Sequence, residues 1–147
     1  MQKGRLAIVL HAHLPYVRSD QENSLEEDWL FQAITECYIP LISVLKDSLS
    51  IDQQIPKLTI SLSPTLLSLL SDENLKKKFP TWIKNRSNLL DNSDDEFFIA
   101  KTDLKNNFQD ILSKWHKYSG DLINQFKELQ KAKVLDILTC AATHGYL

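Results

Sequence analysis

A short apolar run that ends in two histidines is the feature that most constrains how this chain folds. Residues 6–10 read LAIVL, and HAHLP follows directly at residues 11–15. A continuous apolar run of this length predicts a strand that is buried on both faces, as strands of parallel sheets are. Pro15 ends the strand, because proline has no backbone N–H to donate to a neighbouring strand. The run therefore predicts an α/β fold built on a parallel sheet.

His11 and His13 are the first candidate functional residues. Side chains two positions apart on a strand point to the same side, so the two imidazoles can share one site if the strand extends that far. Ligands bind at the carboxyl ends of the strands in α/β folds, and Tyr16 follows closely. The pattern favours an active-site mouth over two merely packed histidines, but it does not name the chemistry. Metal-dependent hydrolases built on barrels also carry His-x-His at the end of their first strand.

Two more strands are expected, over residues 57–62 and 134–140. His144 follows the last of them and falls just beyond its carboxyl end. Because parallel strands end at the same edge of a sheet, His11, His13 and His144 are expected together at one rim. Three histidines at one rim of a three-stranded parallel sheet indicate a site more strongly than any one of them does.

A long helix is expected between the first two strands. Ser24 and Glu27 match a capping box, in which the serine accepts the amide of the third helical residue and the glutamate reaches back to the serine amide. Apolar residues recur at helical spacing up to Leu49, and Pro40 within this pattern predicts a kink or a restart. Ser63 is expected to cap a second helix, whose first residue is a proline.

Three carboxylates and a tryptophan occupy the first turn of the long helix. Glu26, Glu27 and Asp28 are expected to complement the helix dipole there rather than to act in catalysis. Trp29 lies on the side where the chain arrives from the carboxyl end of the first strand. A core position and a sugar-stacking platform beside the histidines are both compatible with this tryptophan.

Residues 71–131 read as helical throughout and are expected to form an inserted helical subdomain. So long a segment exceeds a normal crossover between two strands. Its breaks are a second capping box at residues 93–96 and Gly120. The lysines at positions 76–78 and 84 are expected to form a solvated helix face and not a binding patch.

Composition places the chain among soluble globular proteins, with one domain over residues 1–147. The chain is 43% hydrophobic and has a net charge of −2, which argues against a nucleic-acid partner. No apolar run approaches the roughly 20 residues of a membrane span, and the N-terminal run is too short for a signal peptide. No membrane partner and a cytoplasmic location are therefore expected. Cys37 and Cys140 lie in apolar segments, where we expect buried free thiols.

Four ordered motifs are spread over essentially the whole chain. They are HAHLPY at residues 11–16, LEEDWL at 25–30, LTISLSP at 58–64 and AATHGY at 141–146. Together they resemble glycoside hydrolase family 57, and its 1,4-α-glucan branching enzymes most of all. The resemblance implies that residues 1–147 are the N-terminal part of a (β/α)7 barrel, with three of its parallel strands and the helical insertion.

The resemblance also implies an activity and a set of site residues. Family members cleave an α-1,4-glucan by a retaining mechanism, and branching members transfer the cleaved piece to a 6-hydroxyl. The catalytic glutamate and aspartate of the family lie on later strands, so no catalytic residue is expected in this chain. His11, His13 and His144 would match histidines that line the sugar subsite, and Trp29 would match an aromatic residue near the acceptor side. No cofactor and no metal are implied.

Three functions follow from these observations. The first is a fragment of an α-glucan-active enzyme, from a truncated or split gene, that is inactive alone or active only with a complementary C-terminal chain. The second is a metal-dependent hydrolase with His11, His13 and His144 as ligands, since neutral imidazole suits zinc. The third is a non-catalytic remnant that binds oligosaccharide. The motifs favour the first, with an α-1,4-glucan as its partner, because only the histidines fit the second.

Overall fold

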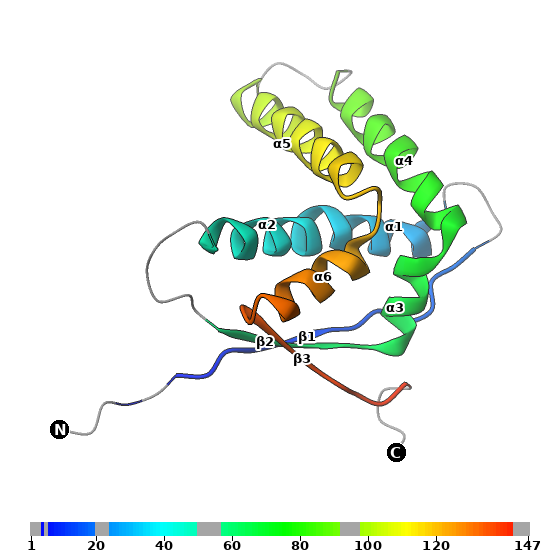
Figure 1. The fold of residues 1–147 in the computed structure, drawn as a ribbon. Coiled ribbons are helices and arrows are strands. Elements are labelled where there is room, and N and C mark those ends of the chain that lie inside the picture. Colours follow the sequence, from blue (N-terminus) through cyan, green and yellow to red (C-terminus); the bar gives the residue numbers. More distant parts are fainter. Residues whose placement is uncertain (1–3, 5, 20–23, 50–56, 92–97, 143–147) are drawn as a thin grey trace.

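Three short strands alternate with helices along the chain, and a long helical stretch precedes the last strand. The computed structural model describes residues 4, 6–19, 24–49, 57–91 and 98–142. In chain order these ranges contain β1 (Val9–Ala12), α1 (Leu25–Ala33), the π-helical segment η1 (Ile34–Tyr38), α2 (Ile39–Ser48), β2 (Leu58–Leu62), α3 (Pro64–Ser71), α4 (Glu73–Asp91), α5 (Phe98–Lys117), α6 (Leu122–Lys131) and β3 (Leu135–Leu138) (Figure 1). None of the described helices combines the length and the apolar character that crossing a membrane requires.

The three strands form one parallel sheet in the order β1-β2-β3, so that β2 lies in the centre. Val9 lies opposite Thr59 and His11 opposite Ser61, which aligns the carboxyl ends of β1 and β2. On the other side of β2, Ser61 lies opposite Leu138. The predicted α/β fold with three parallel strands is confirmed. β1 lies slightly further along the chain than the apolar run at residues 6–10, and β2 and β3 are shorter than the predicted strands at residues 57–62 and 134–140.

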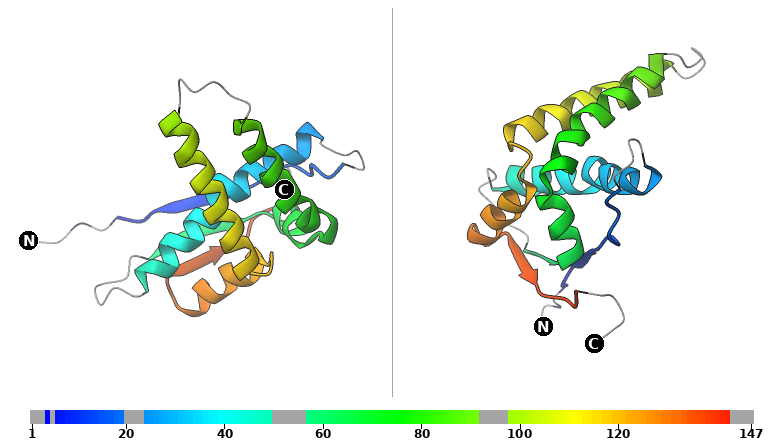
Figure 2. Two further views of the ribbon diagram at one scale, coloured as in Figure 1. Left: turned by 90° about the horizontal axis from the view of Figure 1, so that it is seen from above. Right: turned by 90° about the vertical axis from the view of Figure 1, so that its right-hand side faces the viewer.

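All the described helices lie on one side of the sheet, and the other side is uncovered (Figures 1 and 2). Successive residues of a strand alternate between the two sides. Ile60 and Leu62 face the helices and are 2% and 6% exposed, whereas Val9 and Leu138 on the other side are 60% and 48% exposed. The hydrophobic core therefore lies between the sheet and the helices, and no helix or strand of the described residues packs on the second face of the sheet.

The prediction that the first strand is buried on both faces is wrong. Val9, Leu10 and His11 are exposed, and Ala12 alone is buried. β1 is an edge strand, and the side of the sheet to which Val9 and His11 point is not covered by any described helix or strand. An apolar run shows what a strand is able to bury, but its neighbours decide what it does bury.

The helix between β1 and β2 is continuous but changes its winding in the middle. The π-helical segment η1 separates α1 from α2, and Pro40 lies in the first turn of α2. A proline inside a helix lacks the N–H donor, and its ring crowds the carbonyl four residues earlier. The wider π turn lies where the helix must accommodate this ring. The disturbance predicted at Pro40 thus takes the form of a π segment.

Both predicted serine N-caps are confirmed. Ser24 Oγ accepts a hydrogen bond from the amide of Glu27 at 3.2 Å, and Ser63 Oγ accepts one from the amide of Leu66 at 3.3 Å. Each cap satisfies an amide that has no partner inside its helix. The capping box predicted at residues 93–96 lies outside the described residues.

Helices α4 and α5 lie side by side and project away from the sheet (Figures 1 and 2). Phe79 of α4 packs against Trp115 of α5, with ring centroids 4.5 Å apart. Gly120, with φ of 67°, follows α5 as predicted, and a Cβ at this position would lie 3.0 Å from the Trp115 ring. The buried side chains of these helices belong to the same core as those of the strands. The separate subdomain over residues 71–131 stays a prediction.

Both cysteines are free, but the prediction that they are buried is wrong. Cys37 is exposed, and Cys140 is partly exposed. Cys37 lies in η1, where Ile34 and Tyr38 on the same segment are buried instead. Cys37 lies directly beside the apolar residues of this helix in the sequence. The pattern therefore did not show that Cys37 faces solvent while Ile34 and Tyr38 face the core.

Candidate functional site

The carboxyl ends of β1 and β2 place His11 beside Ser61. The two residues are register partners in neighbouring parallel strands, so their side chains leave the sheet on the same face. His11 Nδ1 lies 2.5 Å from Ser61 Oγ, and this hydrogen bond fixes the rotation of the imidazole. Sequence reasoning missed Ser61, because the register that brings it to His11 is not visible in the sequence.

His13 stacks against His11 just past the end of β1. The two ring centroids are 5.9 Å apart, and the ring planes differ by 4°. The alternation of side chains therefore continues through residue 13, and the structure brings both imidazoles of the His-x-His pair to one place. Two parallel imidazoles can form hydrogen bonds with the same ligand, each as donor or acceptor according to its tautomer.

Hydrogen bonds hold the segment after the histidines against the start of α3. Thr65 Oγ1 donates to the carbonyl of Leu14 at 2.8 Å, and the amide of Ser63 donates to the carbonyl of Ala12 at 3.0 Å. The Ser63 hydroxyl also lies 3.0 Å from Thr65 Oγ1, and Ser63 is fully buried. The two backbone carbonyls that flank His13 in the chain are thus held by residues at the start of α3.

The histidine pair lies on the uncovered face of the sheet. The described strand residues on this face are Val9, His11, Thr59, Ser61, Asp136 and Leu138. Asp136 is the one carboxylate among them. The face therefore offers imidazole, hydroxyl and apolar groups to a ligand or to a polypeptide, with a single acidic group.

Trp29 lies on α1 with 57% of its surface exposed, so it is not a core residue. Within the described part of the chain it makes no ring contact with His11 or His13. The exposure agrees with the binding alternative for this tryptophan, while its nearness to the histidines stays a prediction.

His144 lies outside the described residues. The description reaches Ala142, beyond the end of β3 at Leu138. The third histidine of the predicted rim is therefore untested, and only His11 and His13 are seen together.

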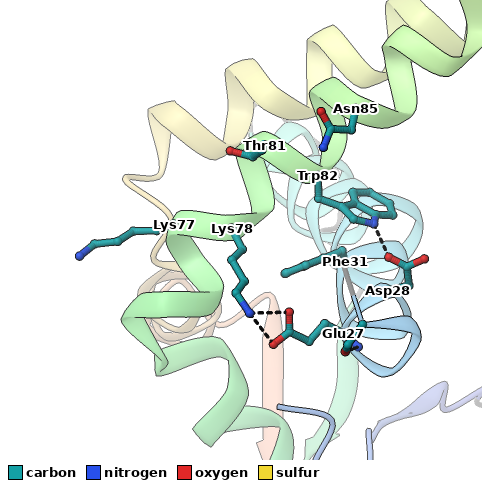
Figure 3. A pocket seen from close by; sticks show the side chains of 9 residues that line it. Glu27, Asp28, Phe31, Lys77, Lys78, Thr81, Trp82 and Asn85 are labelled. Atoms are coloured by element: carbon teal, nitrogen blue, oxygen red, sulfur yellow. Dashed lines mark hydrogen bonds and ion pairs between the residues drawn. The ribbon is translucent and has the colours of Figure 1, made fainter. Parts of the chain in front are cut away.

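A buried ion pair connects the first turn of α1 with α4. Glu27, whose side chain is 2% exposed, accepts two 2.9 Å hydrogen bonds from Lys78 Nζ (Figure 3). The amide of Ser19 donates to the same carboxylate at 3.1 Å. The carboxylate thus binds Lys78 and Ser19 in place of the predicted bond to the Ser24 amide. Lys78 is also an exception to the solvated lysine face predicted for this helix.

Asp28 makes the second connection to α4. Its carboxylate accepts a 2.6 Å hydrogen bond from Trp82 Nε1 and forms a 2.5 Å ion pair with Arg86 (Figure 3). These contacts agree with the structural role predicted for the first-turn carboxylates. The sequence did not show the partners, because Asp28 and Arg86 are 58 residues apart.

The metal-site alternative has no support in the described residues. Across residues 4, 6–19, 24–49, 57–91 and 98–142, no group of three or more His, Cys, Asp and Glu side chains is arranged to hold a metal ion. His11 and His13 are two nitrogen ligands at most, and a structural or catalytic zinc site needs at least three protein ligands.

Residues 7–147 match the family model of glycosyl hydrolase family 57. The chain belongs to this family. The predicted family is therefore confirmed, over almost the whole chain. Among curated relatives, the 1,4-alpha-glucan branching enzyme TK1436 of Thermococcus kodakarensis is 35% identical over 154 aligned residues, which cover 99% of this chain. A probable 1,4-alpha-glucan branching enzyme of Mycobacterium tuberculosis is 28% identical over 56% of this chain.

Solved structures of other proteins share the fold described above. The GH57-type branching enzyme of Pyrococcus horikoshii superposes with a TM-score of 0.89 at 33% identity over 97% of this chain. The α-amylase AmyC of Thermotoga maritima gives a TM-score of 0.85 at 34% identity, also over 97%. The chain covers 28% of each of these two structures and 22% of the length of TK1436. It thus spans about a quarter of the length of TK1436 and of these two structures.

Proposed function

We propose that this family 57 chain binds an α-1,4-glucan through His11 and His13 and takes part in catalysis only together with a further polypeptide. The observation that carries the proposal is the pair of parallel imidazoles at the carboxyl ends of the strands, one of them fixed by Ser61. Imidazole nitrogens donate or accept hydrogen bonds, as sugar hydroxyls do. In this proposal Trp29 supplies a stacking surface on the acceptor side, and His144 is the third imidazole.

The relatives support a glucan as the ligand. TK1436 and the Pyrococcus horikoshii protein are described as branching enzymes, and a structure of TK1436 is a complex with glucose. Both relatives are several times longer than this chain, so a glucan substrate is part of the proposal for this chain.

The need for a further polypeptide follows from the carboxylates. Retaining cleavage of a glycosidic bond uses two carboxyl groups about 5–5.5 Å apart. The described strand residues of the uncovered face contain one carboxylate, Asp136, and therefore no such pair. We assign both catalytic carboxyl groups to a complementary C-terminal chain that packs on this face. The proposed mechanism uses no metal and no cofactor.

The test is binding of maltoheptaose to the purified chain by isothermal titration calorimetry. The His11→Ala variant loses ring hydrogen bonds and leaves Ser61 without its partner, so its Kd should rise about tenfold. His116→Ala is the matched control, because His116 is an exposed histidine on α5. The chain alone should release no reducing ends and form no α-1,6 linkages from amylose. Equal affinity of the two variants, or turnover by the chain alone, would contradict the proposal.

A further inference from the structure

A cavity of about 360 Å³ lies between α1 and α4. Its floor is aromatic, since Phe31 is 3% exposed and packs against Trp82 with ring centroids 5.6 Å apart. Glu27 and Asp28 of α1 form one wall (Figure 3). The volume falls in the range of roughly 300–1,000 Å³ that small-molecule sites occupy, and an apolar floor with a few polar groups is typical of such sites.

Helix α4 supplies the opposite wall with two rows of side chains. Lys78 and Trp82 point toward α1 and bind its carboxylates. The second row consists of Lys77, Thr81 and Asn85. These residues are spaced by four positions and therefore lie on one side of the helix. All three are exposed at the mouth of the cavity, and their side chains form no hydrogen bond or ion pair with other described residues.

The charges inside the cavity are balanced. Glu27 is neutralised by Lys78, and Asp28 by Arg86, so the walls carry no excess of buried charge. A ligand with a net charge of either sign would meet side chains of both signs, the carboxylates of α1 and the lysines of α4. A neutral ligand with many hydroxyls fits better, because Lys77, Thr81 and Asn85 offer donors and acceptors above an aromatic floor.

The cavity lies among the helices, whereas His11 and Ser61 leave the sheet on the side that faces away from these helices. Helix α1 follows β1 in the chain and lies toward the right-hand side of Figure 1. Trp29 follows Asp28 directly and is 57% exposed on the same turn of α1.

We propose that the cavity between α1 and α4 is an additional subsite for an α-glucan chain. A glucose unit packs against the aromatic floor and exchanges hydrogen bonds with Lys77, Thr81 and Asn85. This inference rests on the proposed function, since it takes the same class of ligand. It adds a second binding site for that ligand on the chain. The residues of this second site do not include the histidines.

The test compares two double variants of the 147-residue chain. Lys77→Ala/Asn85→Ala removes two hydrogen-bonding groups from the mouth of the cavity, and Kd for maltoheptaose should rise about tenfold. Lys127→Ala/Asn106→Ala is the matched control, because these residues are of the same types, exposed, and on α6 and α5. Its Kd should stay within about twofold of the wild-type value. A cavity variant that binds like the control overturns the inference.

Amide shifts in ¹H–¹⁵N spectra separate this inference from the function on which it rests. Maltoheptaose should shift the amides of Thr81 and Asn85 as well as those of His11 and Ser61. Shifts confined to His11 and Ser61 overturn the subsite and leave the proposed function standing. Shifts confined to α4 support the subsite and contradict binding at the histidines. A chain that binds no maltoheptaose overturns both.

Discussion

Glu27 takes part in two interactions through two different groups. Its amide is bound by the Ser24 hydroxyl, and its carboxylate joins Lys78 and the amide of Ser19. Lys78 also donates to the Ser19 carbonyl at 3.3 Å, so the pair ties the segment after β1 to α4. Because the Glu27 side chain is 2% exposed, its charge is shielded from water and depends on these partners.

Replacing Lys78 by Met should lower the free energy of unfolding by about 2 kcal/mol, since it leaves the Glu27 carboxylate buried without its cation. The loss falls below the roughly 3–5 kcal/mol typical of fully buried pairs, because 35% of the Lys78 side chain is exposed. Urea unfolding followed by circular dichroism measures the difference.

The neighbouring pair between Lys76 and Glu73 provides the control. Glu73 is 72% exposed there, so Lys76→Met should cost well under about 1 kcal/mol. Adding Glu27→Gln to Lys78→Met should recover part of the loss, because it removes the unpaired charge. Equal destabilisation by the two lysine variants would show that burial of Glu27 does not matter.

Interactions between residues that are close in the sequence could be predicted, and interactions between distant residues could not. A serine three residues before a glutamate predicts the cap at Ser24, because donor and acceptor are held together by the helix itself. The pairing of Glu27 with Lys78, and of His11 with Ser61, joins residues 51 and 50 positions apart. Such pairs depend on helix packing and strand register, which no local pattern determines.

At the scale of elements, η1 shows how the long helix accommodates Pro40 and still buries its inner side. Ile34 and Tyr38 of η1 are buried, and the Tyr38 ring meets Phe126 of α6 edge-on with centroids 6.5 Å apart. Burial of the phenol, with a smaller contribution from Cys37, raises the pKa of Tyr38 to about 12.

This raised pKa predicts a loss of stability at alkaline pH. An unfolded tyrosine ionises near pH 10, so below that pH both states keep the proton and stability does not change. Between about pH 10 and 12 only the folded state keeps it, so the free energy of unfolding falls as pH rises, by about 3 kcal/mol in total. The measurement is urea unfolding at pH 9 and pH 11.5. Tyr38→Phe has no phenol to titrate and should lose less stability over this interval; an identical loss would refute the assignment.

The sequence predicted which segments form helices and strands, but it did not predict which of their faces are buried. The three strands, the capped helices and the break at Gly120 follow from apolar periodicity and from residues with strong local preferences. The apolar run of β1 predicted burial on both faces, and Val9 is nevertheless 60% exposed. Burial requires a partner layer, and the part of the chain that the structure describes does not place one on that face.

For the whole molecule, the uncovered sheet face and the two edge strands predict self-association. Val9 and Leu138 expose apolar surface beside β1 and β3, whose outer edges carry backbone groups with no neighbouring strand in the described residues. The 16.9 kDa chain should therefore elute as a larger species in size-exclusion chromatography with light scattering.

Charge on the uncovered face should prevent this association. Val9→Lys/Leu138→Lys should shift the population toward the monomer, because lysine on an edge strand opposes pairing with another chain. Val44→Lys/Ile99→Lys is the control, since these helix residues are even more exposed, at 66% and 77%. If both double variants restore the monomer equally, association is a general effect of exposed apolar surface and not a property of the sheet.

The order of strands in the sheet has a consequence for synthesis on the ribosome. The strands lie side by side in the order in which they are made, β1, β2 and then β3. Each new strand therefore meets an edge that is already present, and none has to be inserted between two earlier ones. The long helix between β1 and β2 emerges in time to cover the first pair. Assembly of this domain can thus proceed from the N-terminus while translation continues, with the outer edge of β3 as the growing side.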